Sequence, residues 1–299
     1  MNIYSCVDNN NIDKIFVLYY SIYKNTKHFN KLNFCIITDK EITCDIPIFL
    51  KEQLQIKIIK FTDEWELILN NFNKYFYNRS DWCKSDLNFA RFFIFDLFPE
   101  LDRFIYLDWD MIVQKDIYEL KEFYDKDMPI VAMLFNQWNI HRNIIDEKKK
   151  IDKTILKLAE EELGQRDILN YKSSYNSFNS GFYIVSKDDF ILSKLSELIN
   201  KLIKLQKEYQ LFKFGTQVIM NLLFVNCKFI DYKWNTNQIN EQSYIIHWCG
   251  HNKPWTTNDK IWESYRSKML PSNIPSNVDN SDSLKLINKN VLILLKNKL

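Results

Sequence analysis

The feature that most constrains the fold is an alternation of short apolar runs with segments of helical spacing. The runs expected as strands are residues 3–7, 32–38, 56–61 and 103–107. The segments expected as helices are residues 12–24, 63–72 and 85–97, the last with an apolar face through Phe89, Phe93 and Leu97. Strands separated by helices favour parallel pairing, with the helices covering the sheet. The sequence therefore predicts an α/β fold with a Rossmann-like, mixed and mostly parallel sheet flanked by helices.

Length and composition are those of a folded protein. The chain has 299 residues, enough to bury a full core as one large domain or two closely joined ones. Its 46% hydrophobic and 26% charged content excludes broad disorder. Forty basic residues against 38 acidic ones leave a net charge of +2, and this balance argues against nucleic acid as a partner.

The cysteines and the N-terminal sequence indicate the cellular compartment. Six cysteines are scattered without a CxxC pair, so neither a zinc knuckle nor a disulfide framework is predicted. The N-terminal sequence MNIYSCVDNN lacks the basic and apolar segments of a secretory signal. No apolar run approaches the roughly 20 residues that span a bilayer. We therefore expect a cytoplasmic protein.

Two polar clusters follow strands of the predicted sheet. Asp8-Asn9-Asn10 follows the first strand, and Asp108-Trp109-Asp110 follows the run RFIYL. Ligands of such sheets collect at the carboxyl ends of strands. Alternate residues of an extended chain point the same way, and paired carboxylates suit Mg²⁺ or Mn²⁺. The Asp-x-Asp (DxD) pair therefore indicates a divalent metal that would bridge a diphosphate, although the pair alone also occurs in solvated turns and helix caps.

A more specific constellation is the segment His247–Trp255, which reads HWCGHNKPW. His247 follows an apolar run, Gly250 permits close backbone approach, and Lys253 is a compact cation suited to phosphate. A lone histidine in such a place is more often a core residue than a ligand. As a third ligand beside two carboxylates, neutral imidazole would favour Mn²⁺, with Mg²⁺ as the alternative.

Four blocks of the chain match one family in the family's order. They are IYSCVDNNN, the helix with Arg91 followed by RFIYLDWDMIV, FNSGFYIVS, and HWCGHNKPW. On these blocks the chain resembles the family 8 glycosyltransferases, retaining enzymes that include bacterial lipooligosaccharide galactosyltransferases and glycogenin. The resemblance covers roughly residues 1 to 265 and implies the type A glycosyltransferase fold.

The resemblance implies roles for individual residues. It makes Asp108, Asp110 and His247 the metal ligands, and it places Gln217 near the anomeric carbon and Lys253 at the diphosphate, as the catalytic pair. The implied donor-binding residues are Asp8, Asn10, Arg91, Asp108, Asn179, Ser180, Gly181, Gly250 and Lys253. The implied reaction moves a hexose, galactose or glucose, from a UDP-sugar to a hydroxyl of a glycan, glycolipid or glycoprotein with retention of configuration.

The chain departs from the family pattern at several positions. Asn11 replaces a frequent aromatic residue, and Trp109 is bulkier than the usual middle residue of the DxD. Thr216 and Val218 flank Gln217 where family members commonly carry Asp. No aspartate follows the run 131–134, where Asn136 is the nearest polar side chain. These changes leave the identity of the hexose open.

The domain organisation follows from the same patterns. We expect a catalytic domain over residues 1–270, with a nucleotide-binding half over about 1–113 and an acceptor-side half over about 114–270. Residues 271–283 read as a linker, and residues 284–299 as a basic amphipathic, helical C-terminal segment. That segment predicts either peripheral membrane contact or an ordinary packing helix. The polar stretch 137–176 is the first candidate for acceptor binding.

Two other classes of protein compete with this interpretation. Haloacid-dehalogenase phosphatases also place Asp-x-Asp after an apolar strand, but near the start of the domain, and they leave HWCGHNKPW unexplained. A non-catalytic nucleotide-sugar-binding module is compatible with the altered residues around Gln217.

Overall fold

The computed structural model describes most of the expected catalytic domain. The described residues are 1–42, 44, 46–54, 56–60, 67, 69, 86–126, 128–132, 178–188, 207, 216–217, 220, 224 and 227–269. The predicted helix 63–72 lies almost wholly outside them, and so do Asn136, Val218, the stretch 137–176, the linker 271–283 and the segment 284–299.

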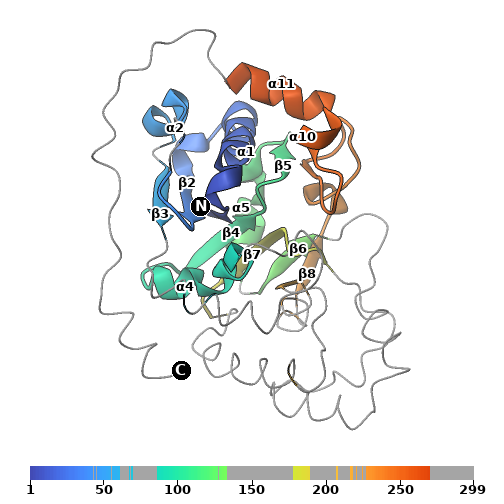
Figure 1. The fold of residues 1–299 in the computed structure, drawn as a ribbon. Helices are drawn as coiled ribbons and strands as arrows, with labels where there is room; N and C mark the ends of the chain where they lie inside the picture. Colours follow the sequence, from blue (N-terminus) through green and yellow to red (C-terminus); the bar gives the residue numbers. More distant parts are fainter. Residues whose placement is uncertain are drawn as a thin grey trace.

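A seven-stranded sheet forms the centre of the described structure (Figure 1). In chain order its strands are β1 (Asn2–Cys6), β2 (Asn33–Thr38), β3 (Lys57–Lys60), β4 (Arg103–Leu107), β6 (Ile130–Ala132), β7 (Phe182–Ser186) and β8 (Lys228–Ile230). They lie in the order β3-β2-β1-β4-β7-β6-β8. Neighbouring strands are parallel except that β7 runs antiparallel to both β4 and β6. The predicted mixed, mostly parallel sheet is confirmed, and the amino end of β7 lies at the carboxyl ends of its neighbours.

A separate two-stranded ribbon lies beside the sheet. It pairs β5 (Met111–Val113) with β9 (Ile245–His247) in antiparallel fashion, with Met111 opposite His247. All residues of both strands are buried. The ribbon brings a segment that begins directly after Asp110 against a segment more than a hundred residues further along the chain.

Helix α1 (Ile12–Asn25) connects this ribbon to the rest of the fold. Its middle, residues 15–22, is buried throughout, as expected for a helix covered on all sides. Ser21 Oγ accepts the Val113 N–H at 2.9 Å, and Asn25 Nδ2 donates to Val113 O at 2.8 Å. The same amide lies 2.7 Å from Tyr265 Oη in α11 (Lys260–Met269). Helix α1 therefore fixes where β5, and with it the DxD segment, lies.

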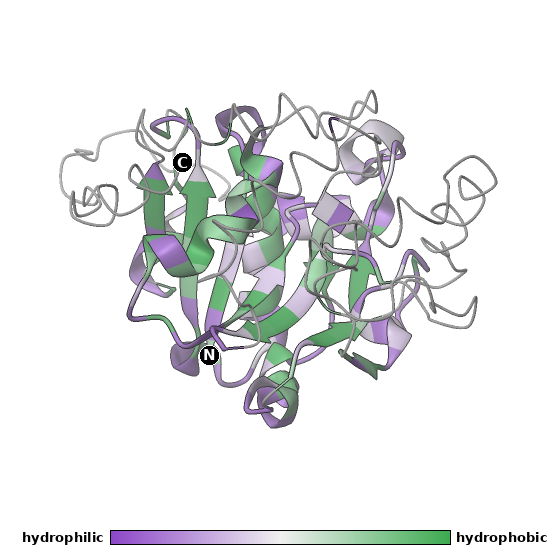
Figure 2. Ribbon diagram, turned by 90° about the horizontal axis from the view of Figure 1, so that it is seen from below, coloured by the Kyte–Doolittle hydropathy of each residue, from purple (hydrophilic) through white to green (hydrophobic). Residues whose placement is uncertain are grey.

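The remaining helices are short. The α-helices are α2 (Ile48–Glu52), α4 (Ile94–Leu97), α5 (Lys121–Tyr124) and α10 (Pro254–Thr257). The 3-10 helices are Asn9–Asn11, Phe29–Lys31, Asp86–Asn88, Ala90–Phe93, Ile117–Leu120 and Tyr232–Trp234. Figure 2 shows hydrophobic residues gathered along the strands, with hydrophilic ones concentrated in the loops. Among the described residues, no helix is long and apolar enough to cross a membrane.

Over its described residues 86–97, the predicted helix 85–97 is broken into 3-10 turns, and only its last part is α-helical. Phe89, Phe93 and Leu97 are buried as the apolar face predicts. The Arg91 Nε–H donates to the Asn88 carbonyl at 2.9 Å, while the Phe92 N–H bonds to Phe89 O at 3.1 Å. An α-helix would need that Asn88 carbonyl for Phe92. The Arg91 side chain therefore donates to the carbonyl that the Phe92 N–H would use in an α-helix.

Candidate active site

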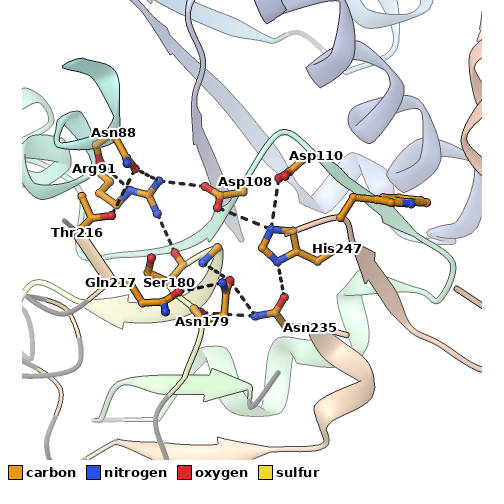
Figure 3. Close-up of polar contacts among 12 residues, drawn as sticks. Asn88, Arg91, Asp108, Asp110, Asn179, Ser180, Thr216, Gln217, Asn235 and His247 are labelled. Atoms are coloured by element: carbon orange, nitrogen blue, oxygen red, sulfur yellow. Dashed lines mark hydrogen bonds and ion pairs between the residues drawn. The ribbon is translucent and has the colours of Figure 1, made fainter. Parts of the chain in front are cut away.

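Polar side chains from several strands meet at the carboxyl edge of the sheet. Asp8 follows β1, Asp39 follows β2 and Asp108 follows β4, and these three strands are parallel neighbours. The segment Asn179–Gly181 precedes the antiparallel β7 and therefore reaches the same edge. The Asp108 N–H donates to Gly181 O at 2.8 Å, which joins the two segments directly. Figure 3 shows the part of this edge that holds Asp108, Asn179 and Ser180.

Asp108, Asp110 and His247 form a candidate metal centre. One ligand atom from each lies within 4.8 Å of the others. His247 Nε2 is 3.3 Å from Asp110 Oδ1 and 3.9 Å from Asp108 Oδ2. Adjacent ligands of an octahedral ion with bonds of about 2.1 Å lie about 3 Å apart. The donor set and its spacing fit a divalent ion, and the structure brings together the three ligands that the sequence predicts.

Local backbone structure explains why His247 reaches the DxD. The pairing of Met111 with His247 places the histidine next to Asp110. The Trp248 N–H donates to Asp110 O at 3.1 Å, and the His247 N–H donates to Thr236 O at 2.8 Å. The ribbon hydrogen bonds therefore set the position of both ligands before any ion binds.

Asn235 controls the orientation of the imidazole. It is fully buried, and its Oδ1 lies 2.8 Å from His247 Nδ1. Because the amide oxygen is an acceptor, Nδ1 carries the proton, and Nε2 is the ring nitrogen that faces the two carboxylates and would ligate an ion. A hydrogen bond of this kind to a metal-ligating histidine fixes the ring and its tautomer. Sequence reasoning missed Asn235, which follows the 3-10 turn Tyr232–Trp234 rather than a recognised motif.

Arg91 lies behind Asp108 and is itself buried. Its Nη2 donates to Asp108 Oδ1 at 3.0 Å and to Asn88 Oδ1 at 2.8 Å. Its Nη1 donates to Ser180 O at 2.8 Å, and its guanidinium lies 4.3 Å from the centre of the Tyr106 ring. A buried guanidinium with this many partners is satisfied by the protein. Arg91 holds Asp108 and the 180–181 backbone, while its predicted contact with the donor sugar stays a prediction.

Gly181 makes room for the candidate metal ligands. A Cβ at this position would lie 2.4 Å from His247 Cε1, 2.7 Å from Asp108 Oδ2 and 2.9 Å from Asn179 Oδ1. Real Cβ atoms do not approach other heavy atoms this closely. Glycine is therefore required here because the backbone passes directly beside two of the three ligands.

Lys253 approaches the same centre from the loop after β9. Its ammonium pairs with Asp110 Oδ2 and donates to Trp248 O at 2.9 Å. Burial alone would raise the pKa of Asp110, but Lys253 and His247 outweigh it and hold that pKa well below its usual range. Asp110 is therefore an anion at neutral pH, with one oxygen toward His247 and the other toward Lys253. The loop that carries Lys253 turns at Gly250, whose φ of 95° favours glycine.

Gln217 is connected to the site through Asn179. The Asn179 amide donates to Gln217 Oε1 at 2.9 Å, and Asn179 Oδ1 accepts the Gly181 N–H at 2.8 Å. Thr216, where the family commonly has Asp, donates to Asn88 Oδ1 at 3.3 Å. The predicted catalytic glutamine therefore lies in the same hydrogen-bonded network as the candidate metal ligands. Asn179 and Asn235 connect it to His247 (Figure 3).

The predicted nucleoside segment forms a capped turn. Asp8 caps the 3-10 helix Asn9–Asn11 by accepting the Asn10 N–H at 3.1 Å, and Asn11 Nδ2 bonds to both Asp8 oxygens at 2.9 and 3.0 Å. Asn11, the departure from the family pattern, thus orients Asp8. The Asn9 N–H donates to Asp39 Oδ1 at 2.9 Å. Sequence reasoning missed Asp39, although its place directly after a strand is the signal that found Asp8 and Asp108.

Comparisons with known proteins agree on one family. A model of glycosyl transferase family 8 matches residues 2–259. The chain is 23% identical over 184 residues to the probable galacturonosyltransferase-like 4 of Arabidopsis thaliana, covering 56% of this chain and 49% of that protein. It is 24% identical over 215 residues to glycosyltransferase 8 domain-containing protein 1 of Homo sapiens, covering 60% and 54%. The chain thus spans about half the length of these curated relatives.

Solved structures share the fold. A galactosyltransferase, LgtC, in complex with donor and acceptor sugar analogues has a TM-score of 0.58 at 14% identity, covering 92% of this chain and 98% of that chain. The apo form of the bifunctional glycosyltransferase WbbM has a TM-score of 0.54 at 17% identity, covering 92% and 50%. The mixed seven-stranded sheet flanked by helices is therefore the type A glycosyltransferase fold.

Proposed function

The chain belongs to glycosyl transferase family 8, and on that basis we propose that it is a UDP-sugar-dependent, retaining hexosyltransferase. The proposed reaction moves galactose or glucose from the UDP-sugar to a hydroxyl of a glycan or glycoconjugate, with Mn²⁺ as the metal and Mg²⁺ as the alternative. The names of the relatives support glycosyl transfer in general. UDP and the hexose are proposed from the sequence resemblance.

The observation that carries the proposal is the convergence of Asp108, Asp110 and His247. Two hard carboxylate ligands and one imidazole suit Mn²⁺, and the imidazole is already held by Asn235. A divalent ion held by these residues would supply positive charge to the diphosphate of the departing nucleotide. The site is prepared for such an ion by groups that the fold has already oriented.

Lys253 is the residue that we propose binds the diphosphate, next to the candidate metal ligands. A lysine ammonium has three N–H donors, and two of them reach Asp110 and Trp248 O. In the proposed complex the third donates to a phosphate oxygen. Fixed positive charge beside a developing anion stabilises the transition state, typically by about 3 kcal/mol for one donor. We propose this role for Lys253.

The residues near the proposed anomeric centre favour attack of the acceptor from the same face as the departing UDP. A double displacement needs a nucleophile on the far face of the sugar. Gln217 is a poor nucleophile, and the hydroxyl of Thr216 is bonded to Asn88. Asn179 instead orients the Gln217 carbonyl oxygen, which suits a polar contact to the sugar. We propose that Gln217 positions the sugar and does not bond to it covalently.

Of the two competing classes of protein, one is excluded and the other is left to experiment. The DxD follows the fourth strand of the described sheet, its partners include His247 and Lys253, and the family is a glycosyltransferase family. These findings exclude the phosphatase interpretation. The non-catalytic binding module differs from the transferase by the absence of turnover, so the experiment must separate binding from transfer.

The test is a panel of UDP-sugars with Mn²⁺, scored for UDP release with and without candidate glycan acceptors. We expect release from one or two hexose donors, stimulated by acceptor and abolished by a chelator. Mn²⁺-dependent UDP binding with no release across the whole panel would support the binding module. Release from a donor other than UDP-galactose or UDP-glucose would correct the sugar and leave the class of reaction intact.

Acceptor binding and membrane contact stay predictions, because residues 137–176 and 284–299 lie outside the described part of the chain. If residues 284–299 bind membrane, deleting them lowers binding to anionic liposomes while UDP release from the donor is retained. Unchanged liposome binding after the deletion would remove that role. The cytoplasmic location proposed from the sequence is checked by fractionation of cells that produce the full-length protein.

A further inference from the structure

Trp109, the unusual middle residue of the DxD, contacts a second tryptophan. Its ring stacks on Trp255 with the ring centroids 5.0 Å apart and an interplanar angle of 23°. Both rings are partly buried against the core. Trp255 lies two residues after Lys253. The stack therefore connects the segment that supplies two metal ligands with the segment that supplies the candidate diphosphate lysine.

Lys253 is itself in contact with this pair. Its ammonium lies 5.9 Å from the centre of the Trp109 ring, within the range of a cation–π interaction. One indole thus packs against both Lys253 and Trp255, on either side of Pro254. These contacts restrict where the lysine side chain and its backbone lie.

The aromatic contacts continue to the other end of the same loop. Trp255 meets Trp262 of α11 edge to face at 5.4 Å, and Trp248 meets Trp262 at 5.7 Å. Trp248 directly precedes the loop Cys249–Lys253 and Trp255 closely follows it. Because both ends of the loop pack on Trp262, the stack on Trp109 adds a third attachment close to Lys253.

A lysine of α1 extends the connection to the nucleoside segment. Lys14 Nζ donates to Asn10 O at 3.3 Å and lies 5.7 Å from the centre of the Trp255 ring. The segment with Asp8 and Asn10, the DxD and the Lys253 loop thus share one set of contacts. All three are segments to which the UDP-sugar is proposed to bind.

We propose that Trp109 and Trp255 form a positioning pair that holds Lys253 and its loop in the orientation that binds the donor diphosphate. This inference rests on the proposed function for the identity of the ligand. The stack would hold the Lys253 loop in the same way whichever ligand binds. Trp109 is a positioning residue here, because it acts through Lys253 rather than through contact with the sugar nucleotide.

The test compares Trp109→Leu, which removes the stack, with Trp109→Phe, which keeps a ring. Aromatic pairs contribute about 0.5–1.5 kcal/mol beyond their buried area, so Trp109→Leu lowers the affinity for UDP with Mn²⁺ between about twofold and tenfold. Trp109→Phe restores most of that affinity. The affinity for Mn²⁺ without nucleotide changes less than twofold in both variants, because Asp108, Asp110 and His247 are retained.

Two further measurements separate positioning from direct contact. Amide hydrogen exchange at residues 249–253 of the metal-free protein rises in Trp109→Leu and stays near wild type in Trp109→Phe. In the double variant Trp109→Leu/Trp255→Leu, the loss of UDP affinity is smaller than the product of the two single losses, because both remove one stack.

A matched control is Phe29→Leu, which breaks the Tyr23–Phe29 pair, also 5.0 Å between centroids, at the other end of α1. It leaves exchange at 249–253 unchanged.

The outcomes decide between defined alternatives. If UDP affinity falls in Trp109→Leu while exchange at 249–253 is unchanged, Trp109 contacts the nucleotide directly and the positioning role is wrong. If only the KM for the acceptor changes, the ring belongs to the acceptor site and the proposal is again wrong. If the wild-type protein binds no UDP, the proposed function fails, and the exchange measurement still decides whether the stack holds the loop.

Discussion

The hydrogen bond between Asn235 and His247 gives the sharpest quantitative expectation. Asn235 is 0% exposed and His247 is 2% exposed, so water cannot readily replace the amide oxygen 2.8 Å from Nδ1. In Asn235→Ala the Nδ1 proton loses its partner, and an unsatisfied buried donor costs about 1–3 kcal/mol. Loss of the hydrogen-bond partner of a metal-ligating histidine typically lowers metal affinity 10–100-fold, which corresponds to about 1.4–2.7 kcal/mol. The two ranges overlap although they come from different kinds of measurement.

The assay is calorimetric titration of Mn²⁺ into the full-length protein, with wild type, Asn235→Ala and Asn235→Asp compared under one condition. Asn235→Ala should bind Mn²⁺ roughly 10–100-fold more weakly, while circular dichroism shows the same secondary structure. Asn235→Asp keeps an acceptor for Nδ1 and should retain most of the affinity. Equal Mn²⁺ affinity in wild type and Asn235→Ala would refute the reasoning, because the tautomer would then need no partner from the protein.

Three further predictions follow from the site. Gly181→Ala places a Cβ 2.4 Å from His247 Cε1 and 2.7 Å from Asp108 Oδ2, so the ligands must shift, and we expect Mn²⁺ affinity to fall by at least about tenfold in the same titration. Lys253→Ala removes a donor worth about 3 kcal/mol and should lower turnover on the order of a hundredfold; unchanged turnover would remove the lysine from the mechanism. Because the pKa of Asp110 is depressed in the folded protein, its contribution to stability is present above the unfolded value of about 3.9 and is lost as the pH falls through the folded value. Asp110→Asn should therefore flatten the acid side of the stability profile in urea unfolding, and an unchanged profile would contradict the ion pair with Lys253.

The strands and α1 were predictable because their periodicity is strong and local. Residues 103–107 were expected and found as a strand, and the expected helix 12–24 is Ile12–Asn25. The expected strand 3–7 is Asn2–Cys6. Each of these strands is buried after its first residue, and α1 is buried over residues 15–22, so the apolar runs and the helical spacing predicted these elements.

The region around Arg91 was not predictable from periodicity. Its apolar residues have helical spacing, but a buried arginine takes up a backbone carbonyl and the chain forms 3-10 turns. The tertiary partners of Arg91, which include Asp108, Ser180 O and the Tyr106 ring, make burial of that side chain favourable. Those partners are distant in the sequence, so a local pattern does not contain them.

The three candidate metal ligands were predictable from motifs, and their supporting residues were not. Asp108 and Asp110 follow a strand, and His247 lies in a recognisable block. Asn235 lies in no motif, and its role depends on the pairing of β5 with β9 and on the backbone bond from His247 N–H to Thr236 O. Asp39 is a different case, since its place after a strand was visible and was overlooked.

The affinity for UDP, measured with Mn²⁺ and with a chelator for wild type and Asp110→Asn, decides whether the three side chains form a metal site. The site described here predicts that wild type binds UDP with Mn²⁺ and loses at least about tenfold in affinity when the metal is removed. Asp110→Asn should resemble the chelated wild type under both conditions. Equal UDP affinity with and without Mn²⁺ in the wild-type protein would contradict the claim that Asp108, Asp110 and His247 form a metal site for a nucleotide diphosphate.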